Sequence, residues 1–110
     1  MRTFHLTTSR RRSFRQGLAN NLITYGKMTT TEARAKEIRP IVERYISLAK
    51  KQQTAQLRLL LSKLPKAAAT KLFYEIAPKY KTRNGGYLRI TKVAAQRMRD
   101  GSKMATIEFV

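Results

Sequence analysis

The sequence contains no cysteine, no tryptophan and a single histidine, and only 6 of its 110 residues are acidic. Without cysteine there is no disulfide framework, no thiolate zinc site and no cysteine nucleophile. No purely apolar run is longer than that of Leu59–Leu61, whereas a membrane-spanning helix needs about 18 apolar residues. These absences predict a chain that neither depends on disulfides nor inserts into a membrane.

The shortage of histidine and acidic residues also leaves little for catalysis. General acid–base chemistry uses a histidine or a close pair of carboxylates. His5 lies in an N-terminal arm, and the acidic residues are scattered among basic ones without metal-ligand spacing. Gly85 and Gly86 lack the following helix and the Lys-Ser/Thr pair of a phosphate-binding P-loop. The sequence therefore predicts no enzyme, no metal site and no small-molecule substrate.

Positive charge is what the chain has in excess. Lysine and arginine total 24, so the net charge is +18 and the isoelectric point is near 11.2. Self-repulsion destabilises the free protein, and a polyanion such as nucleic acid or an anionic membrane surface removes that penalty. The hydrophobic content of 42% is compatible with a packed core. We expect a single domain over residues 1–110, with residues 1–8 as a flexible basic arm.

Periodicity predicts an α+β order of helix, short strand, three further helices and a C-terminal β-hairpin. Residues 9–25 form the first predicted helix, with Gly26 as its C-terminal stop. Residues 27–30 are rich in threonine and favour an edge strand. The apolar stripe of the first helix consists of Phe14, Leu18, Leu22 and Tyr25.

The second predicted helix begins among residues that offer several N-caps. Thr29 and Glu32 have capping-box spacing, although Thr30 or Thr31 can cap equally well. Pro40 lies inside the helical pattern, where it removes a hydrogen bond and is expected to kink or restart the helix. The apolar stripe of this helix consists of Ile38, Val42, Tyr45 and Ala49.

Two shorter helices follow. Thr54 is expected to cap the third helix, and Pro65 to occupy the first turn of the fourth. The fourth helix is expected to end before Pro78.

Beyond residue 78 the period changes from helical to alternating. A glycine turn at residues 84–86 precedes a predicted strand over residues 87–93. A second strand over residues 104–110 has Ala105, Ile107 and Phe109 on its inward face. The basic segment between the two strands is expected to form a loop with a turn at residues 100–101.

Arginines at the start of the first helix form the first candidate nucleic-acid contact. A helix N-terminus favours anions, so a cluster of cations there is unexpected for the isolated protein. Phosphate groups would supply the anions by pairing with the guanidinium groups and the free helix N–H groups. The alternative is an ordinary solvated run of charges. The N-terminal candidates are Arg2, Arg10, Arg11, Arg12, Arg15 and Lys27.

A second candidate surface surrounds the glycine turn. Glycines there allow another backbone to approach closely. Tyr87 and Arg89 share a strand face, so the tyrosine either stacks on an unpaired base or packs within the hairpin. The members of this set are Lys79, Lys81, Arg83, Gly85, Gly86, Tyr87 and Arg89.

Two further groups of basic residues are candidates for RNA binding. The loop of the predicted hairpin carries Arg97, Arg99 and Lys103. On the second helix, long basic side chains alternate with the apolar stripe, and simple solvation is favoured for at least half of them. The second-helix candidates are Arg34, Lys36 and Arg39, with Arg44 beyond them.

The chain resembles the bacterial large-subunit ribosomal protein family numbered seventeen. Its Thr-Thr-x-Ala-Arg-Ala-Lys-Glu and Gly-Gly-Tyr-x-Arg blocks are the most specific parts of the match, which runs from about residue 10 to the C-terminal residue. The matching segments are Phe14–Leu18, Asn21–Leu22, Tyr25–Ala33, Ala35–Pro40, Ile46–Lys50, Lys71–Phe73, Ile76–Tyr80, Arg83–Tyr87, Arg89–Ile90 and Met104–Glu108.

The resemblance implies a two-layer α/β domain in which helices cover a small mixed sheet. It implies binding to 23S-type large-subunit rRNA near the exit of the peptide tunnel, beside other large-subunit proteins and not as a homo-oligomer. It also implies no cofactor and no catalytic residue. The compact ends of the chain favour a ribosome of the bacterial cytoplasm over that of an organelle. Residues 10–27 match the family's mature first helix, which argues against an organellar transit peptide. Residues 3–8 depart from the family's basic start, so contacts of this arm are not carried over.

Two alternatives come from other functional classes. The charge alone fits a free DNA-binding or nucleoid protein, although no helix-turn-helix or zinc-finger spacing supports it. A cationic protein of the membrane surface is the other alternative, and here basic residues interrupt the apolar helix faces.

Overall fold

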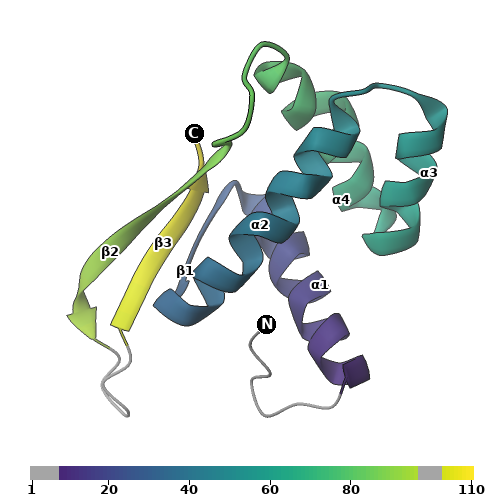
Figure 1. Ribbon diagram of the computed structural model, residues 1–110. Coiled ribbons are helices and arrows are strands. Elements are labelled where there is room, and N and C mark those ends of the chain that lie inside the picture. Colours follow the sequence, from purple (N-terminus) through teal and green to yellow (C-terminus); the bar gives the residue numbers. More distant parts are fainter. Residues whose placement is uncertain (1–7, 97–102) are drawn as a thin grey trace.

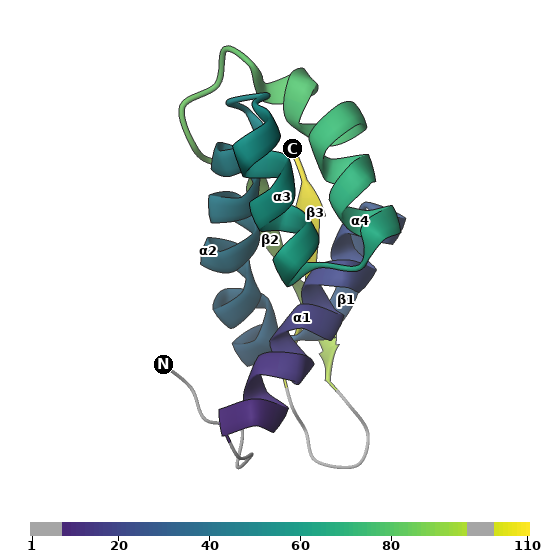
Figure 2. The same ribbon diagram turned by 90° about the vertical axis from the view of Figure 1, so that its right-hand side faces the viewer.

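The computed structural model of the chain describes residues 8–96 and 103–110, and within these ranges four α-helices lie on one side of a three-stranded sheet, the first two of them packed against it (Figure 1). Figure 2 looks onto the helices with the sheet behind them. The predicted α+β fold with two layers is confirmed. The elements are α1 (Thr8–Tyr25), β1 (Lys27–Thr31), α2 (Glu32–Ala49), α3 (Thr54–Lys63), α4 (Lys66–Lys71), the π-helical η1 (Leu72–Ile76), the 3-10 helix η2 (Ala77–Tyr80), β2 (Leu88–Gln96) and β3 (Lys103–Phe109).

The sheet has the strand order β1-β3-β2, and β3 pairs antiparallel with both neighbours. The mixed sheet implied by the resemblance is therefore wrong for the described strands, because the central strand runs opposite to both edge strands. The predicted alternation of β3 is confirmed: Ala105 and Ile107 are buried, and Phe109 is half-buried against the core. β1 is an edge strand, as its threonine-rich sequence predicts.

The β2–β3 hairpin is longer than predicted. β2 continues to Gln96 through a register irregularity between Val93 and Gln96. The two alanines in this stretch interrupt the alternating pattern, so the sequence alone predicts an end at residue 93. The turn predicted at residues 100–101 lies outside the described residues.

Helix α1 ends at the predicted glycine. Gly26 has a φ of +81°, and its N–H donates to the Leu22 carbonyl oxygen at 2.8 Å, as in a left-handed C-terminal glycine. The buried face of α1 differs from the predicted stripe. Leu22 is buried together with Ala19 and Ile23, whereas Tyr25 is 76% exposed. The prediction is wrong at Tyr25 because α1 packs against both α2 and α4, which turns its buried face toward Ala19 and Ile23.

Helix α2 is capped by Thr31, whose side-chain oxygen accepts from the Arg34 N–H at 3.3 Å. The alternative cap at Thr29 does not form, because α2 begins at Glu32 and the residue directly before it is Thr31, whereas the Thr29 hydroxyl hydrogen-bonds to the Thr106 hydroxyl at 3.1 Å. The helix continues through Pro40 without a restart. The packing of the apolar stripe on both sides of the proline therefore outweighs the loss of one backbone hydrogen bond.

We expect Thr31→Ala to lower the free energy of unfolding by about 1 kcal/mol, because a helix N–H loses its partner. Thr54→Ala is the matched control, since Thr54 lies in the first turn of α3 without a capping role. That variant should change the free energy of unfolding by less than about 0.5 kcal/mol. Urea denaturation measures both, and equal losses would contradict the assignment of Thr31 as the cap.

The region from residue 54 to residue 80 departs from the predicted boundaries. Thr54 is already helical, and Gln53 precedes it as an N-cap residue without a side-chain hydrogen bond. Pro65 occupies the N-cap position of α4, not its first helical position. Pro78 lies inside η2 and does not end the helical segment. Backbone N–H groups in the first turn of a helix have no partner within the helix, so a proline, which lacks this group, is tolerated there. Pro78 is therefore compatible with the first turn of η2.

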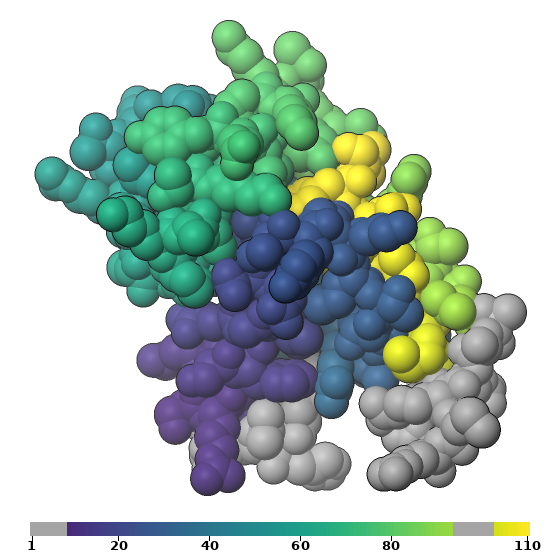
Figure 3. All heavy atoms as spheres, turned by 180° about the vertical axis from the view of Figure 1, so that it is seen from behind, coloured from purple at the N-terminus to yellow at the C-terminus, as the bar shows by residue number. Residues whose placement is uncertain are grey.

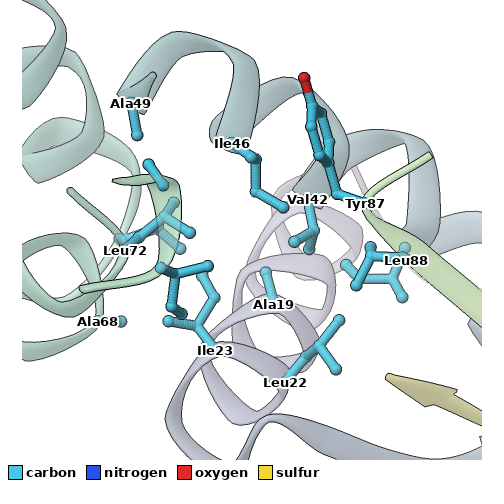
Figure 4. Packing of buried hydrophobic residues seen from close by; sticks show 14 of the residues in the cluster. Ala19, Leu22, Ile23, Val42, Ile46, Ala49, Ala68, Leu72, Tyr87 and Leu88 are labelled. Atoms are coloured by element: carbon cyan, nitrogen blue, oxygen red, sulfur yellow. The ribbon is translucent and has the colours of Figure 1, made fainter. Parts of the chain in front are cut away.

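One cluster of buried apolar side chains joins the helices to the sheet. Figure 4 shows Leu22 and Ile23 of α1 pointing toward this interior together with Ile46 of α2 and Leu72 of η1. Leu88, at the start of β2, closes the cluster from the side of the sheet. This packing fixes the positions of the helices whose outer faces carry the basic residues.

Candidate nucleic-acid interface

The first basic cluster lies at the start of α1, which has no acidic residue in its first turn. Arg10 and Arg12 are exposed, and Arg11 and Arg15 are half-buried. Figure 3 shows the side chains of this end of α1 projecting from the lower edge of the molecule. Arg15 also has partners within the protein, because its Nε donates to the Arg11 carbonyl oxygen at 3.3 Å and its Nη1 lies 4.0 Å from the Glu37 carboxylate.

The second basic cluster begins within η2 and continues into the loop that follows it. Lys79, Lys81 and Arg83 are all exposed. Gly85 and Gly86 have φ values of +90° and +65°, and the space beside both Cα atoms is open. This left-handed conformation favours glycine, and the open space leaves room for the backbone of a partner.

A lysine from the end of α2 anchors the loop of the second cluster. The Lys50 Nζ donates to the Arg83 carbonyl oxygen and, at 2.8 Å, to the Tyr87 hydroxyl oxygen. The Tyr87 hydroxyl in turn donates to the Arg83 carbonyl at 3.2 Å. Burial by itself would raise the pKa of Tyr87, but hydrogen bonds from Lys50 and from the Gly85 backbone lower this pKa below its ordinary value. The backbone that carries Arg83 is thereby tied to α2.

Tyr87 is 3% exposed, and its ring lies 5.3 Å from that of Tyr80, measured between centroids. Of the two interpretations of Tyr87, packing within the protein is the one that the structure shows. Base stacking on Tyr87 is not retained, because almost none of the ring is accessible. Arg89, which shares a face with Tyr87 in the predicted strand, is exposed and its Nε donates to Glu108 Oε1 at 2.8 Å.

The three side chains of α2 that are candidates for RNA binding already have partners within the protein. Ion pairs between exposed groups contribute only about 0–1 kcal/mol, so a phosphate can replace the carboxylate at small cost. The interactions are Lys36 Nζ to Glu32 Oε1 at 2.8 Å, Arg39 Nε to Glu43 Oε1 at 3.0 Å, and the Arg34 guanidinium 5.0 Å from the centroid of the Phe14 ring.

The remaining candidates are distributed over the sheet or lie outside the described residues. Lys27 on β1 is exposed and stands opposite Glu108 in the strand register. Lys103 is exposed at the start of β3. Arg2, Arg97 and Arg99 belong to the segments that the structure does not describe.

The structure does not bring the two main basic clusters together. The start of α1 and the loop after η2 lie at opposite ends of the molecule in both Figure 1 and Figure 2. The molecule measures 45 × 31 × 22 Å along its principal axes. A single phosphate therefore cannot meet both clusters, and each cluster can contact a different stretch of a polyanion.

An open groove of about 640 Å³ lies between the start of α1 and α2. Its lining joins arginines of the first cluster to Arg44 of α2 and Lys63 at the end of α3, with Tyr45 also on its wall. From the sequence alone, Arg44 is one of four cations of the second helix, for at least half of which simple solvation is favoured. Tyr45 is expected to belong to the core, and nothing singles out Lys63. No sequence pattern relates Lys63 to α1, because only the packing of α3 brings them to one groove.

Four acidic side chains of the described region serve as partners of basic groups. Glu32, Glu37, Glu43 and Glu108 each pair with a lysine or arginine. No group of three or more histidine or acidic residues suited to a metal ion occurs among the residues described. Within the same residues, every helix is too short or too polar to cross a membrane.

The chain is similar to proteins of the large ribosomal subunit. Residues 14–110 match the family described as "Ribosomal protein L17". A protein of Persephonella marina, named "Large ribosomal subunit protein bL17", is 48% identical over 111 aligned residues, which cover 99% of this chain and 90% of that protein. Proteins of the same name from Hydrogenobaculum sp. and Agrobacterium fabrum are 45% and 44% identical, covering 97% and 99% of this chain and 92% and 77% of their own lengths.

Proposed function

Because the chain belongs to the ribosomal protein L17 family and is a structural constituent of the large ribosomal subunit, we propose that it clamps segments of large-subunit rRNA near the exit of the peptide tunnel. The partner RNA is of the 23S type, and neighbouring large-subunit proteins are further partners. The ribosome concerned is that of the bacterial cytoplasm. The family resemblance supports the location, and the distribution of charge supports the clamp.

The observation that carries the clamp is the separation of the two basic clusters. Arg10 and Arg12 are exposed at one end of the molecule, and Lys79, Lys81 and Arg83 are exposed at the other. The rigid core between them holds the two ends at a fixed separation. Two RNA segments that repel each other can be held at that separation when each is neutralised by one cluster.

Binding should rest mainly on phosphate contacts. Each lysine or arginine that meets a phosphate releases condensed counterions, which drives association without reading the sequence of the RNA. The glycine turn next to Arg83 supplies open backbone beside the cations. The lysine and arginine of the α2 ion pairs are further cations, which can leave their carboxylate partners and pair with a phosphate. Recognition then depends on the shape and backbone of the RNA.

Replacing Arg10, Arg11 and Arg12 together by alanine is expected to weaken binding to large-subunit rRNA by roughly ten- to a hundredfold, because several phosphate contacts are lost. The melting temperature of the free protein should not fall, since alanine favours the helix and the self-repulsion decreases. Fluorescence anisotropy with labelled rRNA fragments measures the affinity, and calorimetry measures the melting temperature.

A matched control removes the same charge elsewhere. Lys51, Arg58 and Lys66 are exposed on the helical side of the protein and belong to neither basic cluster, so their joint replacement by alanine should weaken binding much less. Equal losses in the two triple variants would mean that only total charge matters, and unchanged affinity of the arginine variant would refute the role of α1.

Footprinting of assembled subunits tests the location, which is refuted if protection lies away from the tunnel exit.

A further inference from the structure

The groove between α1 and α2 differs chemically from the two basic clusters because it has an apolar floor. Pro40, Ile41 and Tyr45 line it from α2. Ile41 and Tyr45 are one helical turn apart and therefore lie on the same side of the helix. Both side chains are half-buried and pack against the core, whereas Pro40 is exposed. Apolar side chains are thus available to a ligand in this groove.

The rim of the groove is strongly cationic. Arg12, Arg44 and Lys63 are exposed and come from three different helices. The single carboxylate of the lining, that of Glu37, lies 4.0 Å from Arg15 Nη1, so its charge is already compensated. The groove therefore presents net positive charge above the apolar floor.

Polar groups also reach the groove. Gln16 lines it from α1, and an amide side chain offers both donors and an acceptor. Burial raises the pKa of Tyr45 above its ordinary value, so its hydroxyl stays protonated and can both donate and accept. These groups suit the polar edge of a nucleobase.

We propose that this groove holds one unpaired nucleotide of RNA, with the base against Tyr45 and Ile41 and the flanking phosphates on Arg12, Arg44 and Lys63. The inference rests on the proposed function. It adds that the RNA element bound by the helical side contains an unpaired nucleotide. A paired base of an A-form helix cannot enter, because pairing and stacking hold the base inside the duplex. A bulged or looped-out base can enter, and the cations beside the aromatic ring suit its phosphates better than they suit an apolar peptide.

The test uses the full chain and two RNA hairpins that differ only by one bulged adenosine. The wild-type protein is expected to bind the bulged hairpin about tenfold more tightly, within the range for stacking one base on an aromatic side chain. Tyr45→Leu keeps an apolar side chain but removes the aromatic face, and should abolish this preference. Tyr25→Leu is the matched control, because Tyr25 is 76% exposed at the other end of α1 and should leave the preference unchanged.

A second variant leaves the apolar packing of the groove intact. Arg44→Gln alters an exposed groove residue and should reduce the preference for the bulged hairpin, whereas Arg58→Gln, on an exposed site of α3 outside the groove, should not. Equal affinity of the wild-type protein for the two hairpins would overturn the inference, and so would a preference that survives in both Tyr45→Leu and Arg44→Gln. If an acidic peptide competes with rRNA for the groove and the bulged hairpin does not, the groove belongs to a protein partner and the inference is overturned. In each case the proposed function stands if rRNA still binds with a steep salt dependence, so the failure of this inference and the failure of the proposed function are distinguishable.

Discussion

Raising the monovalent salt concentration from about 50 mM to about 200 mM will weaken binding of the chain to large-subunit rRNA by about 10³-fold, the loss expected for on the order of six phosphate contacts. Six is the number of lysines and arginines in the two sets Arg10, Arg11, Arg12 and Lys79, Lys81, Arg83. The slope of log affinity against log salt is roughly −0.7 to −0.9 for each phosphate neutralised. The basic clusters of the two ends thus predict a steep slope.

The measurement is a series of equilibrium titrations of a labelled rRNA fragment at several salt concentrations. The arginine triple variant supplies an internal check, because losing three phosphate contacts should reduce the slope by roughly 2 to 3. Duplex DNA of equal length belongs in the same series. A flat slope with rRNA would refute the phosphate mechanism, and tighter binding to DNA than to rRNA would favour the nucleoid alternative.

Ile46→Ala will lower the free energy of unfolding by about 2–5 kcal/mol, the usual cost of truncating a fully enclosed aliphatic side chain. Ile46 is 0% exposed and faces the interior between α2, η1 and the start of β2 (Figure 4). Its removal leaves a cavity that the surrounding helices can fill only in part. Because a small domain is stable by only about 5–15 kcal/mol, this loss should be visible as a large fall in the urea midpoint.

Leu59→Ala is the matched control for the core variant. Leu59 lies on α3 and is 45% exposed, so truncation should change the free energy of unfolding by less than about 0.5 kcal/mol. Measuring both variants at high and low salt separates packing from charge repulsion. A loss below about 1 kcal/mol for Ile46→Ala would contradict the enclosed position of this side chain.

Much of the fold can be predicted from local pattern. The stripe of α2 predicts the burial of Ile38, Val42 and Ala49, and the alternation of β3 predicts the burial of Ala105 and Ile107. Gly26 ends α1 as expected because its left-handed conformation is accessible to glycine at little cost. These features depend on the spacing of apolar residues along one element or on the backbone preference of a single residue.

Errors arise where an element has neighbours on more than one side. The predicted stripe of α1 fails at Tyr25 because α2 and α4 both cover α1 and turn its buried face. Pro40 does not restart α2, because apolar packing on both sides of the proline keeps the helix continuous. Tyr87 is predicted equally well as buried or as available for stacking, and only contact with Tyr80 and Lys50 decides in favour of burial.

The basic residues of the candidate site likewise show features that the sequence predicts and features that only the packing decides. The sequence by itself determined the excess of positive charge, the two runs of basic residues at Arg10–Arg12 and near Arg83, and the family, because composition and short motifs are properties of the chain alone. Only the tertiary structure decided that these runs lie at opposite ends, that Lys36 and Arg39 pair with carboxylates, and that Lys63 joins Arg12 and Arg44 around one groove. Distances between residues far apart in the chain are set by the packing of helices on the sheet, and no local period contains that information.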